Sequence, residues 1–234
     1  MTLIQIITPF PQMATALIGE SILARATAKG LVEYRLHDLF QYADPPHYRI
    51  DDYPFGGGSG MVMKPEPLFR ATEQAISNGP DNSSTRVVYP TPDAPLFSQS
   101  KARELAHAEH LVFLSGHYKG VDQRVRDLLV TDELSIGDYV LTGGELPTMV
   151  ILDAVVRLIP GVLNSIESAE TDSHTSDLLD WPHYTRPVQF QDLKVPDVLL
   201  SGHHGKIAEW RRKQEELKTR SIRPDLWQKY KESK

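Results

Sequence analysis

Short apolar runs alternate with longer amphipathic stretches over the first part of the chain. The apolar runs are rich in Val, Ile, Leu and Tyr, as buried strands are, and they lie at Leu3–Ile7, Val32–Leu36, Arg86–Tyr89 and Leu111–Leu114. Helical spacing is clearest at Pro65–Ser77 and Ser98–Ala108, which begin with an early proline or a capping serine. Strands that alternate with helices predict an α/β fold with a parallel sheet. Ligands of such a sheet bind beyond the carboxyl ends of its strands.

The character of the sequence changes after a strongly apolar helix, Leu146–Leu158, which Pro160-Gly161 ends. Residues 161–180 hold five acids, no lysine or arginine, and many Ser, Thr and Asn residues, which is the composition of a linker. Two polar helices are predicted beyond it, at His204–Leu217 and Pro224–Lys231. We therefore expect an α/β domain over residues 1–160, a flexible linker over 161–176 and a small C-terminal helical domain over 177–234.

The composition is that of an ordinary globular protein and excludes several kinds of chemistry. Hydrophobic residues make up 40% and charged residues 24% of the 234 positions, which argues against disorder. The absence of cysteine excludes disulfides, thiolate metal sites and a cysteine nucleophile. Met1–Phe10 lacks the features of a signal peptide, and no apolar run reaches the roughly 18 residues that span a bilayer. We expect a cytoplasmic protein with no membrane partner.

The net charge of −6 is unevenly distributed along the chain. Residues 201–234 contain ten lysines and arginines against five acids, so the remainder is acidic. A basic end on an acidic body attracts phosphates locally. A solvated helix surface is the alternative interpretation.

The glycines of the chain gather in three clusters, at Tyr53–Met61, Ser115–Asp122 and Ser135–Pro147. None follows the first strand, where a dinucleotide-binding turn would need them. The first cluster has four glycines in five residues, so its backbone either exposes N–H groups in a sharp turn or forms a plain surface loop. The second follows a strand, where glycine lets a ligand lie against main chain; alternatively, it is a tight turn with Asp122 as helix cap.

The third cluster turns through paired glycines into the apolar helix. Loops of this kind can hold an adenine by main-chain hydrogen bonds and apolar contacts. A purely structural strand–turn–helix is the alternative.

Five segments carry a resemblance to a known family: PFGGGSGMVMKPEP, SIGDYVLTGGELP, RLIPGVL, PHYTRP and SGHH. In this order and spacing they resemble the signatures of the bacterial tRNA (guanine-N1-)-methyltransferases, and they span nearly the whole chain. The resemblance implies transfer of a methyl group from S-adenosylmethionine to N1 of guanine 37, the guanine that follows the anticodon of a tRNA.

The resemblance also implies a fold and an assembly that the pattern alone does not reveal. The family belongs to the knotted, SPOUT-type methyltransferases, in which the α/β domain forms a deep trefoil knot, a rare exception to ordinary topology. The knot holds the cofactor in a bent shape, and the family works as a homodimer whose active sites use both subunits. Its transfer reaction depends on Mg²⁺, for which no dedicated site is visible here, and no other metal is expected.

Carried over by position, the family's cofactor contacts fall on Tyr89, Pro90, Gly116, Ser135, Ile136, Gly137, Tyr139, Leu141, Gly143, Gly144 and Pro147. Lys119 stands where many relatives have an acidic residue, so we expect it to face the cofactor's carboxylate rather than its ammonium group. The segment Thr91–Pro95 also differs from the family's Pro-Gln-Gly pattern near the guanine.

The resemblance places the general base at Asp172 and its partner at Arg157. Guanine N1 becomes a good nucleophile when a carboxylate takes its proton, and a guanidinium stabilises the charge that then builds on O6. Both residues have alternative, purely structural roles. Arg157 could form an ion pair with Asp153 along the helix, and Asp172 could be a solvated acid or a helix cap. We expect residues 161–175 to become ordered only when tRNA binds.

The residues that we expect to contact RNA combine basic side chains, aromatic rings and flexible main chain. They are Gly57, Gly58, His183, Tyr184, Arg186, His203, His204, Lys206 and Arg211. Capping and packing are the alternative roles for the paired histidines. Two other functions stay open. One is a non-catalytic RNA-binding protein on the same scaffold, and the other is a metal-dependent hydrolase that uses Asp172, His174, His203 and His204.

Overall fold

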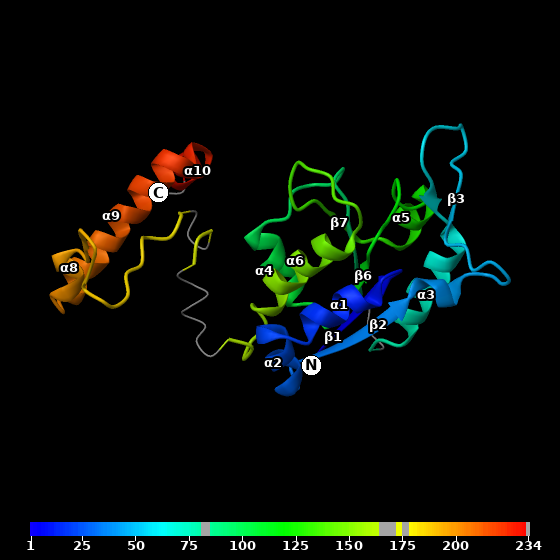
Figure 1. Cartoon of the computed structure of the whole chain (residues 1–234), viewed down its shortest axis with the longest axis horizontal. Coiled ribbons are helices and arrows are strands. Elements are labelled where there is room, and N and C mark those ends of the chain that lie inside the picture. The colour runs from blue at the N-terminus through cyan, green and yellow to red at the C-terminus, as the bar shows by residue number, and fades with distance from the viewer. Residues whose placement is uncertain (81–84, 164–171, 175–177, 233–234) are drawn as a thin grey trace. The chain divides into compact units, whose positions relative to one another are not determined.

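The computed structural model describes residues 1–80, 85–163, 172–174 and 178–232, and the protein divides into two compact units. The first unit is Met1–Asn164 and the second is Ser165–Lys234. Figure 1 shows the elements of both.

The first unit is built on a five-stranded sheet in the order β2-β1-β6-β5-β7, and every pair of neighbouring strands is parallel. The strands are β1 (Thr2–Thr8), β2 (Val32–Asp38), β5 (Thr85–Pro90), β6 (His110–Leu114) and β7 (Asp132–Leu134). All seven residues of β1 are buried, because β1 pairs with β2 on one side and β6 on the other. The parallel sheet that the sequence predicts is therefore confirmed.

Helices cover both faces of this sheet. One face carries α1 (Pro11–Ile18), α2 (Ser21–Ala28), α4 (Gln99–Ala106) and α6 (Glu145–Val156), and the other carries the 3-10 turn η1 (Leu39–Tyr42), α3 (Pro65–Ser77) and α5 (Gln123–Leu129). Alternate residues of each strand pack against the helices of opposite faces, because successive side chains of a strand point to opposite sides of the sheet. Leu111 and Phe113 of β6 pack under the first set of helices, and Val112 and Leu114 under the second.

Four predicted strands and the helices at Pro65–Ser77, Ser98–Ala108 and Leu146–Leu158 are confirmed, with bounds that shift by at most two residues. Ser98 is the cap of α4, and its hydroxyl accepts from the backbone N–H of Lys101. The sequence did not predict α1, α2 or β7, and it offered α5 only through the alternative of Asp122 as a helix cap. A short antiparallel pair, β3 (Asp51–Asp52) and β4 (Val62–Met63), carries the first glycine cluster in its connecting loop.

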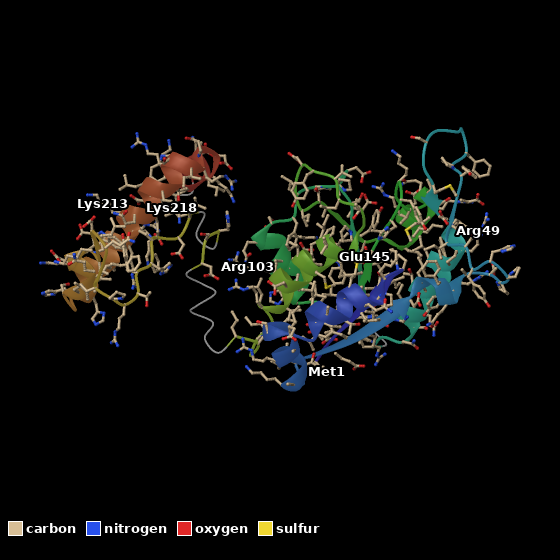
Figure 2. All side chains as sticks on the ribbon, in the orientation of Figure 1. Met1, Arg49, Arg103, Glu145, Lys213 and Lys218 are labelled. Atoms are coloured by element: carbon tan, nitrogen blue, oxygen red, sulfur yellow. The ribbon has the colours of Figure 1, made fainter. Side chains whose placement is uncertain are left out.

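The second unit is centred on the helices α9 (His204–Ile222) and α10 (Pro224–Glu232), which confirm the two predicted polar helices. They pack on each other through Tyr230, which is buried beneath the guanidinium of Arg212 at 4.9 Å from the ring centre. The unit also holds the pair β8 (Gln189–Phe190) and β9 (Leu193–Lys194) and the short α8 (Asp197–Leu200). Lys213 and Lys218 belong to α9 in Figure 2.

None of the described helices is both long enough and apolar enough to cross a membrane.

Candidate functional site

The loops that follow β5, β6 and β7 enclose a cavity of about 750 Å³ at the carboxyl ends of these strands. Its volume falls in the range of small-molecule sites, roughly 300–1,000 Å³. The predicted cofactor contacts all line it, namely Tyr89, Pro90, Gly116, Lys119, Ser135, Ile136, Gly137, Tyr139, Leu141, Gly143, Gly144 and Pro147. The fold thus gathers these residues around one cavity, whereas their contact with a cofactor stays a prediction.

The second glycine cluster forms the turn between β6 and α5. Gly116 lies so close to Tyr89 that an added Cβ would approach the ring to 2.9 Å. Gly120 has a φ of +130°, a conformation that side chains disfavour. Asp122 caps α5 by accepting from the backbone N–H of Arg124 at 2.9 Å, so the capping interpretation of this acid is confirmed. A helix cap and a turn that lines the cavity thus belong to one segment.

The third cluster crosses directly over the second. The backbone N–H of Gly144 donates to the carbonyl of Gly116 at 2.6 Å, and Gly143 forms an isolated bridge with His117. A Cβ on Gly144 would lie 2.5 Å from the backbone nitrogen of Gly116, which no real Cβ does. Only glycine fits where the two main chains touch. The loops are pinned again by a 3.0 Å hydrogen bond between the hydroxyls of Ser115 and Thr148.

Residues 135–143 form a loop between β7, which ends at Leu134, and α6. The segment thus runs from strand through loop to helix, and both the structural and the ligand-binding interpretations remain open here. The ring of Tyr139 folds over Gly137, where a Cβ would lie 2.4 Å from the ring, and its hydroxyl donates to the carbonyl of Ile136 at 3.3 Å. The backbone of Phe97 holds the loop from behind by donating to the carbonyl of Ser135 at 2.8 Å. The loop presents main chain and apolar side chains to the cavity.

Arg126 organises the outer wall of the cavity. It pairs with Glu133 at 2.6 Å and with Asp93 at 2.9 Å, and its guanidinium lies 5.6 Å from the centre of the Tyr89 ring. The hydroxyl of Thr91 also donates to Asp93. This hydrogen bond and the pairing with Arg126 hold the pKa of Asp93 below its usual value, while burial raises the pKa of Tyr89. Asp93 thus fixes the segment Thr91–Pro95, where the sequence departs from the family pattern.

Sequence reasoning missed a buried acid beside the cavity. Glu145 is the first residue of α6 and is 2% exposed, and Figure 2 places it inside the first unit. Its carboxylate lies between Thr8 and His117, which also lines the cavity. An acid in the first turn of a helix is common. The sequence therefore carried no signal for the long-range contacts of Glu145.

The two predicted catalytic residues belong to different units. Arg157 follows α6 in the first unit, and its backbone N–H donates to the carbonyl of Asp153 at 3.2 Å. Asp172 belongs to the second unit and is half-buried. Much of the predicted linker, at 164–171 and 175–176, lies outside the described residues. The structure neither joins nor separates the proposed base and its partner.

Every residue predicted to contact RNA is exposed. Gly57 and Gly58 lie on the β3–β4 loop with φ values of +79° and +114°, and nothing lies within 4 Å of their Cβ positions. The others are in the second unit: His183, Tyr184, Arg186, His203, His204, Lys206 and Arg211. His203 and His204 stand at the N-terminal end of α9.

Rings and cations gather on the second unit. The guanidinium of Arg211 lies 4.7 Å from the centre of the Trp181 ring, and Trp181 lies 5.4 Å from His183. His183 in turn contacts Asp180 at 2.6 Å. Aromatic rings and arginine planes on one surface suit unpaired bases.

Among residues 1–80, 85–163, 172–174 and 178–232, no group of three or more histidines and acids is arranged to hold a metal ion.

Comparison with known proteins adds a family. The sequence profile described as tRNA (Guanine-1)-methyltransferase TrmD matches residues 2–229. The chain is 55% identical over 227 residues to the tRNA (guanine-N(1)-)-methyltransferase of Shouchella clausii (strain KSM-K16), covering 97% of this chain and 92% of that protein. It is 49% identical over 223 residues to the protein of the same name from Bacillus subtilis (strain 168), covering 95% and 91%. The corresponding protein of Clostridioides difficile (strain 630) is 47% identical over 224 residues, with 96% of each chain covered.

Proposed function

The chain belongs to the tRNA (guanine-1)-methyltransferase family, and from this premise we propose that it methylates N1 of guanine 37 in tRNA with S-adenosylmethionine as the methyl donor. The observation that carries the proposal is the cavity where two glycine loops cross at the carboxyl ends of β5, β6 and β7. Parallel α/β sheets bind their ligands at this edge.

The cavity fits S-adenosylmethionine in size and in chemistry. Its volume of about 750 Å³ suits a nucleoside with an amino-acid tail. The glycines at the crossing line the cavity with main chain, and Ile136, Leu141 and Pro147 supply apolar surface for an adenine. When bound, the cofactor supplies an electrophilic methyl group. We assign Lys119, which also lines the cavity, to the carboxylate of its methionine part.

We further propose that the crossing of the two glycine loops belongs to a trefoil knot. The contact between Gly144 and Gly116 joins segments that follow different strands, and α6 begins directly after it. A knot at this point would hold the cavity walls in place before the ligand arrives, which lowers the ordering cost of binding.

In the proposed mechanism, Asp172 removes the N1 proton of guanine as the methyl group arrives. The carboxylate acts as general base, and the guanidinium of Arg157 stabilises the negative charge that builds on O6. At each active site of a dimer, one subunit supplies Asp172 and the other supplies Arg157. We expect the reaction to depend on Mg²⁺, and we assign no residue to hold the ion.

The apolar surface of α1 and α6 supports a homodimer. Leu146 and Val150 lie one turn apart on α6 and are 50% and 51% exposed. Met13 and Leu17 of α1, which packs against α6, are exposed as well. Large exposed apolar side chains on two helices that pack together are a feature of protein interfaces. We propose that a second copy of the chain covers them.

We assign tRNA binding to the β3–β4 loop and to the second unit. The exposure of all the predicted RNA contacts and the stacked pair of Arg211 and Trp181 support this assignment. Family membership favours the methyltransferase over the metal-dependent hydrolase and over an RNA-binding protein without activity.

The proposal is tested by transfer of labelled methyl from S-adenosylmethionine to a tRNA transcript with guanine after the anticodon. We expect wild-type protein to label N1 of that guanine. Asp172→Asn keeps the shape and removes the base, so transfer should fall by about 10²–10⁴-fold while cofactor and tRNA still bind. Asp192→Asn, which changes an exposed acid between β8 and β9, is the matched control and should transfer normally.

Chelation of Mg²⁺ should stop transfer, and added Mg²⁺ should restore it. If wild-type protein binds tRNA and cofactor but transfers nothing under any of these conditions, the chain is an RNA-binding protein and the proposal is wrong. If Asp172→Asn transfers at the wild-type rate, another group is the base.

A further inference from the structure

A buried carboxylate lies beneath the crossing of the two glycine loops. Glu145 is 2% exposed, and each of its oxygens has one donor. The hydroxyl of Thr8 donates to Oε1 at 2.7 Å, and Nε2 of His117 lies 2.8 Å from Oε2. The three residues come from the end of β1, the loop after β6 and the start of α6. We call them the Glu145 clasp.

Phe10 and Gly143 also pack closely against the clasp. The hydroxyl of Thr8, which donates to Glu145, also accepts from the backbone N–H of Phe10 at 2.9 Å. The ring of Phe10 meets the imidazole of His117 edge-on, with the ring centres 5.0 Å apart. Gly143 leaves no room for change, because a Cβ there would lie 2.1 Å from Nε2 of His117 and 2.7 Å from Oε2 of Glu145.

Stability alone is a weak reason for such an arrangement. Burying a charge carries a large desolvation cost, and well-packed apolar residues usually serve a core as well or better. The start of α6 offsets part of the cost, because the N-terminal end of a helix favours negative charge. Apolar residues, however, cannot form directional hydrogen bonds. A carboxylate can accept hydrogen bonds but cannot donate them. It therefore fixes the positions of both donors and requires the proton of His117 to be on Nε2.

Both directed bonds act on the walls of the cavity. His117 lies in the second glycine loop and lines the cavity. Glu145 directly follows Gly143 and Gly144, which make the crossing contacts with His117 and Gly116. A shift of Glu145 would therefore move both loops relative to each other, and a displacement of about 1 Å at a reaction site is enough to lower a rate a hundredfold.

We propose that Glu145, Thr8 and His117 are positioning residues that hold the two glycine loops in the geometry that binds the methyl donor. The inference rests on the proposed function of the cavity. The clasp makes no chemical step; it acts on the ligand through the loop crossing.

The test compares variants that break the clasp with one that breaks another buried carboxylate. Glu145→Gln keeps the shape but offers an amide where an acceptor is required, and Thr8→Val removes a hydroxyl at nearly constant volume. The control is Asp132→Asn. Asp132 is 5% exposed and is held by Arg86 and Lys101 at the start of β7, the opposite end of the strand from the cavity.

Three experiments are made on each full-length variant. They give the melting temperature, the Kd for S-adenosylmethionine and for S-adenosylhomocysteine by calorimetry, and the kcat and KM of methyl transfer. We expect all three variants to melt at lower temperature. Glu145→Gln and Thr8→Val should raise both Kd values and the cofactor KM by at least about tenfold, because they break charge-assisted hydrogen bonds. Asp132→Asn should leave Kd and KM unchanged. The tRNA KM should stay the same throughout.

His117→Asn completes a double-mutant cycle with Glu145→Gln. If the two residues act as one clasp, the double variant binds the cofactor no more weakly than the worse single variant. Additive losses of affinity would overturn the proposal. So would wild-type affinity in Thr8→Val, a variant that decides the matter even if Glu145→Gln does not fold. Failure of wild-type protein to bind either ligand would instead contradict the proposed function.

Discussion

Gly144 illustrates how a single residue type decides the geometry of the site. Its backbone touches that of Gly116, with a 2.6 Å hydrogen bond and no space for a Cβ. Gly205, in the first turn of α9, is the opposite case, because nothing lies within 4 Å of its Cβ position. Both glycines lie at the start of a helix, and their surroundings determine how each would respond to an added Cβ.

We expect Gly144→Ala to separate the loops and Gly205→Ala to be tolerated. The added methyl would force the backbones apart, so the free energy of unfolding should fall by about 1–3 kcal/mol, as in other overpacked sites. Cofactor affinity should fall with it. Gly205→Ala should keep the affinity and slightly raise stability, since alanine favours a helix over glycine. Urea unfolding and calorimetry on both variants are the measurements, and equal behaviour of the two would refute the steric account.

The residues at the site could be predicted only where their signal is local. The glycine clusters follow strands and precede helices, so a ligand site at the sheet edge could be inferred from them. The clasp could not, because Thr8 and Glu145 are 137 positions apart and meet only through the strand order. Tyr139 folding over Gly137 likewise depends on the conformation of the loop.

At the scale of elements, the length of a helix or strand and its capping residues determined whether the sequence could predict it. The 13-residue α3 and the 12-residue α6 fill a window in which apolar periodicity can be recognised. The unpredicted α1 and α2 have eight residues each and no capping side chain, whereas the equally short α4 could be predicted from its capping Ser98. Strand β7 has only three residues. The strand order was also out of reach, because it depends on non-local pairing of strands that are similarly apolar.

The exposed face of α6 predicts an effect of charge on assembly. Val150→Glu places a carboxylate in the proposed subunit interface, where it would have to be desolvated, so we expect a monomer with little methyl transfer. Leu128→Glu is the matched control, because Leu128 is 70% exposed on α5, away from the α1–α6 surface. Sedimentation velocity distinguishes the two states. A dimeric Val150→Glu, or a Leu128→Glu that dissociates equally, would remove α6 from the interface.

At the scale of the whole first unit, one polar network joins the sheet to the layer of α3. The amide nitrogen of buried Gln5 contacts the carbonyl of Ala75 at 2.6 Å and Nε2 of His110 at 2.8 Å, while its oxygen lies 2.7 Å from Nε2 of His37. Nδ1 of His110 contacts the hydroxyl of Thr85 at 2.8 Å. Since the amide donates to His110, the network requires this imidazole to be neutral. It links β1, β2, β5 and β6 through groups that cannot all be satisfied once a proton is added.

This network predicts that stability falls in mildly acidic solution. Burial, followed by the nearby charge of Arg35, lowers the pKa of both His37 and His110 below the ordinary value of about 6.5. The unfolded chain therefore binds protons more readily than the folded one. The free energy of unfolding is at its full value above the unfolded pKa and decreases as the pH falls below it, by up to about 1.4 kcal/mol per pH unit for each histidine.

The measurement is urea unfolding between pH 7.5 and pH 5, before the carboxylates with lowered pKa values contribute. The pKa of Asp132 is lowered to about 2, so the stability from its ion pairs is lost only as the pH falls below the ordinary range of an aspartate. His110→Gln removes one titrating group. It should be less stable than wild type at pH 7.5 but should lose less stability on acidification, and subtracting the two curves cancels every group that they share. Parallel curves would mean that His110 is not the group that senses the pH, and the neutral network would then owe its acid sensitivity to His37 alone.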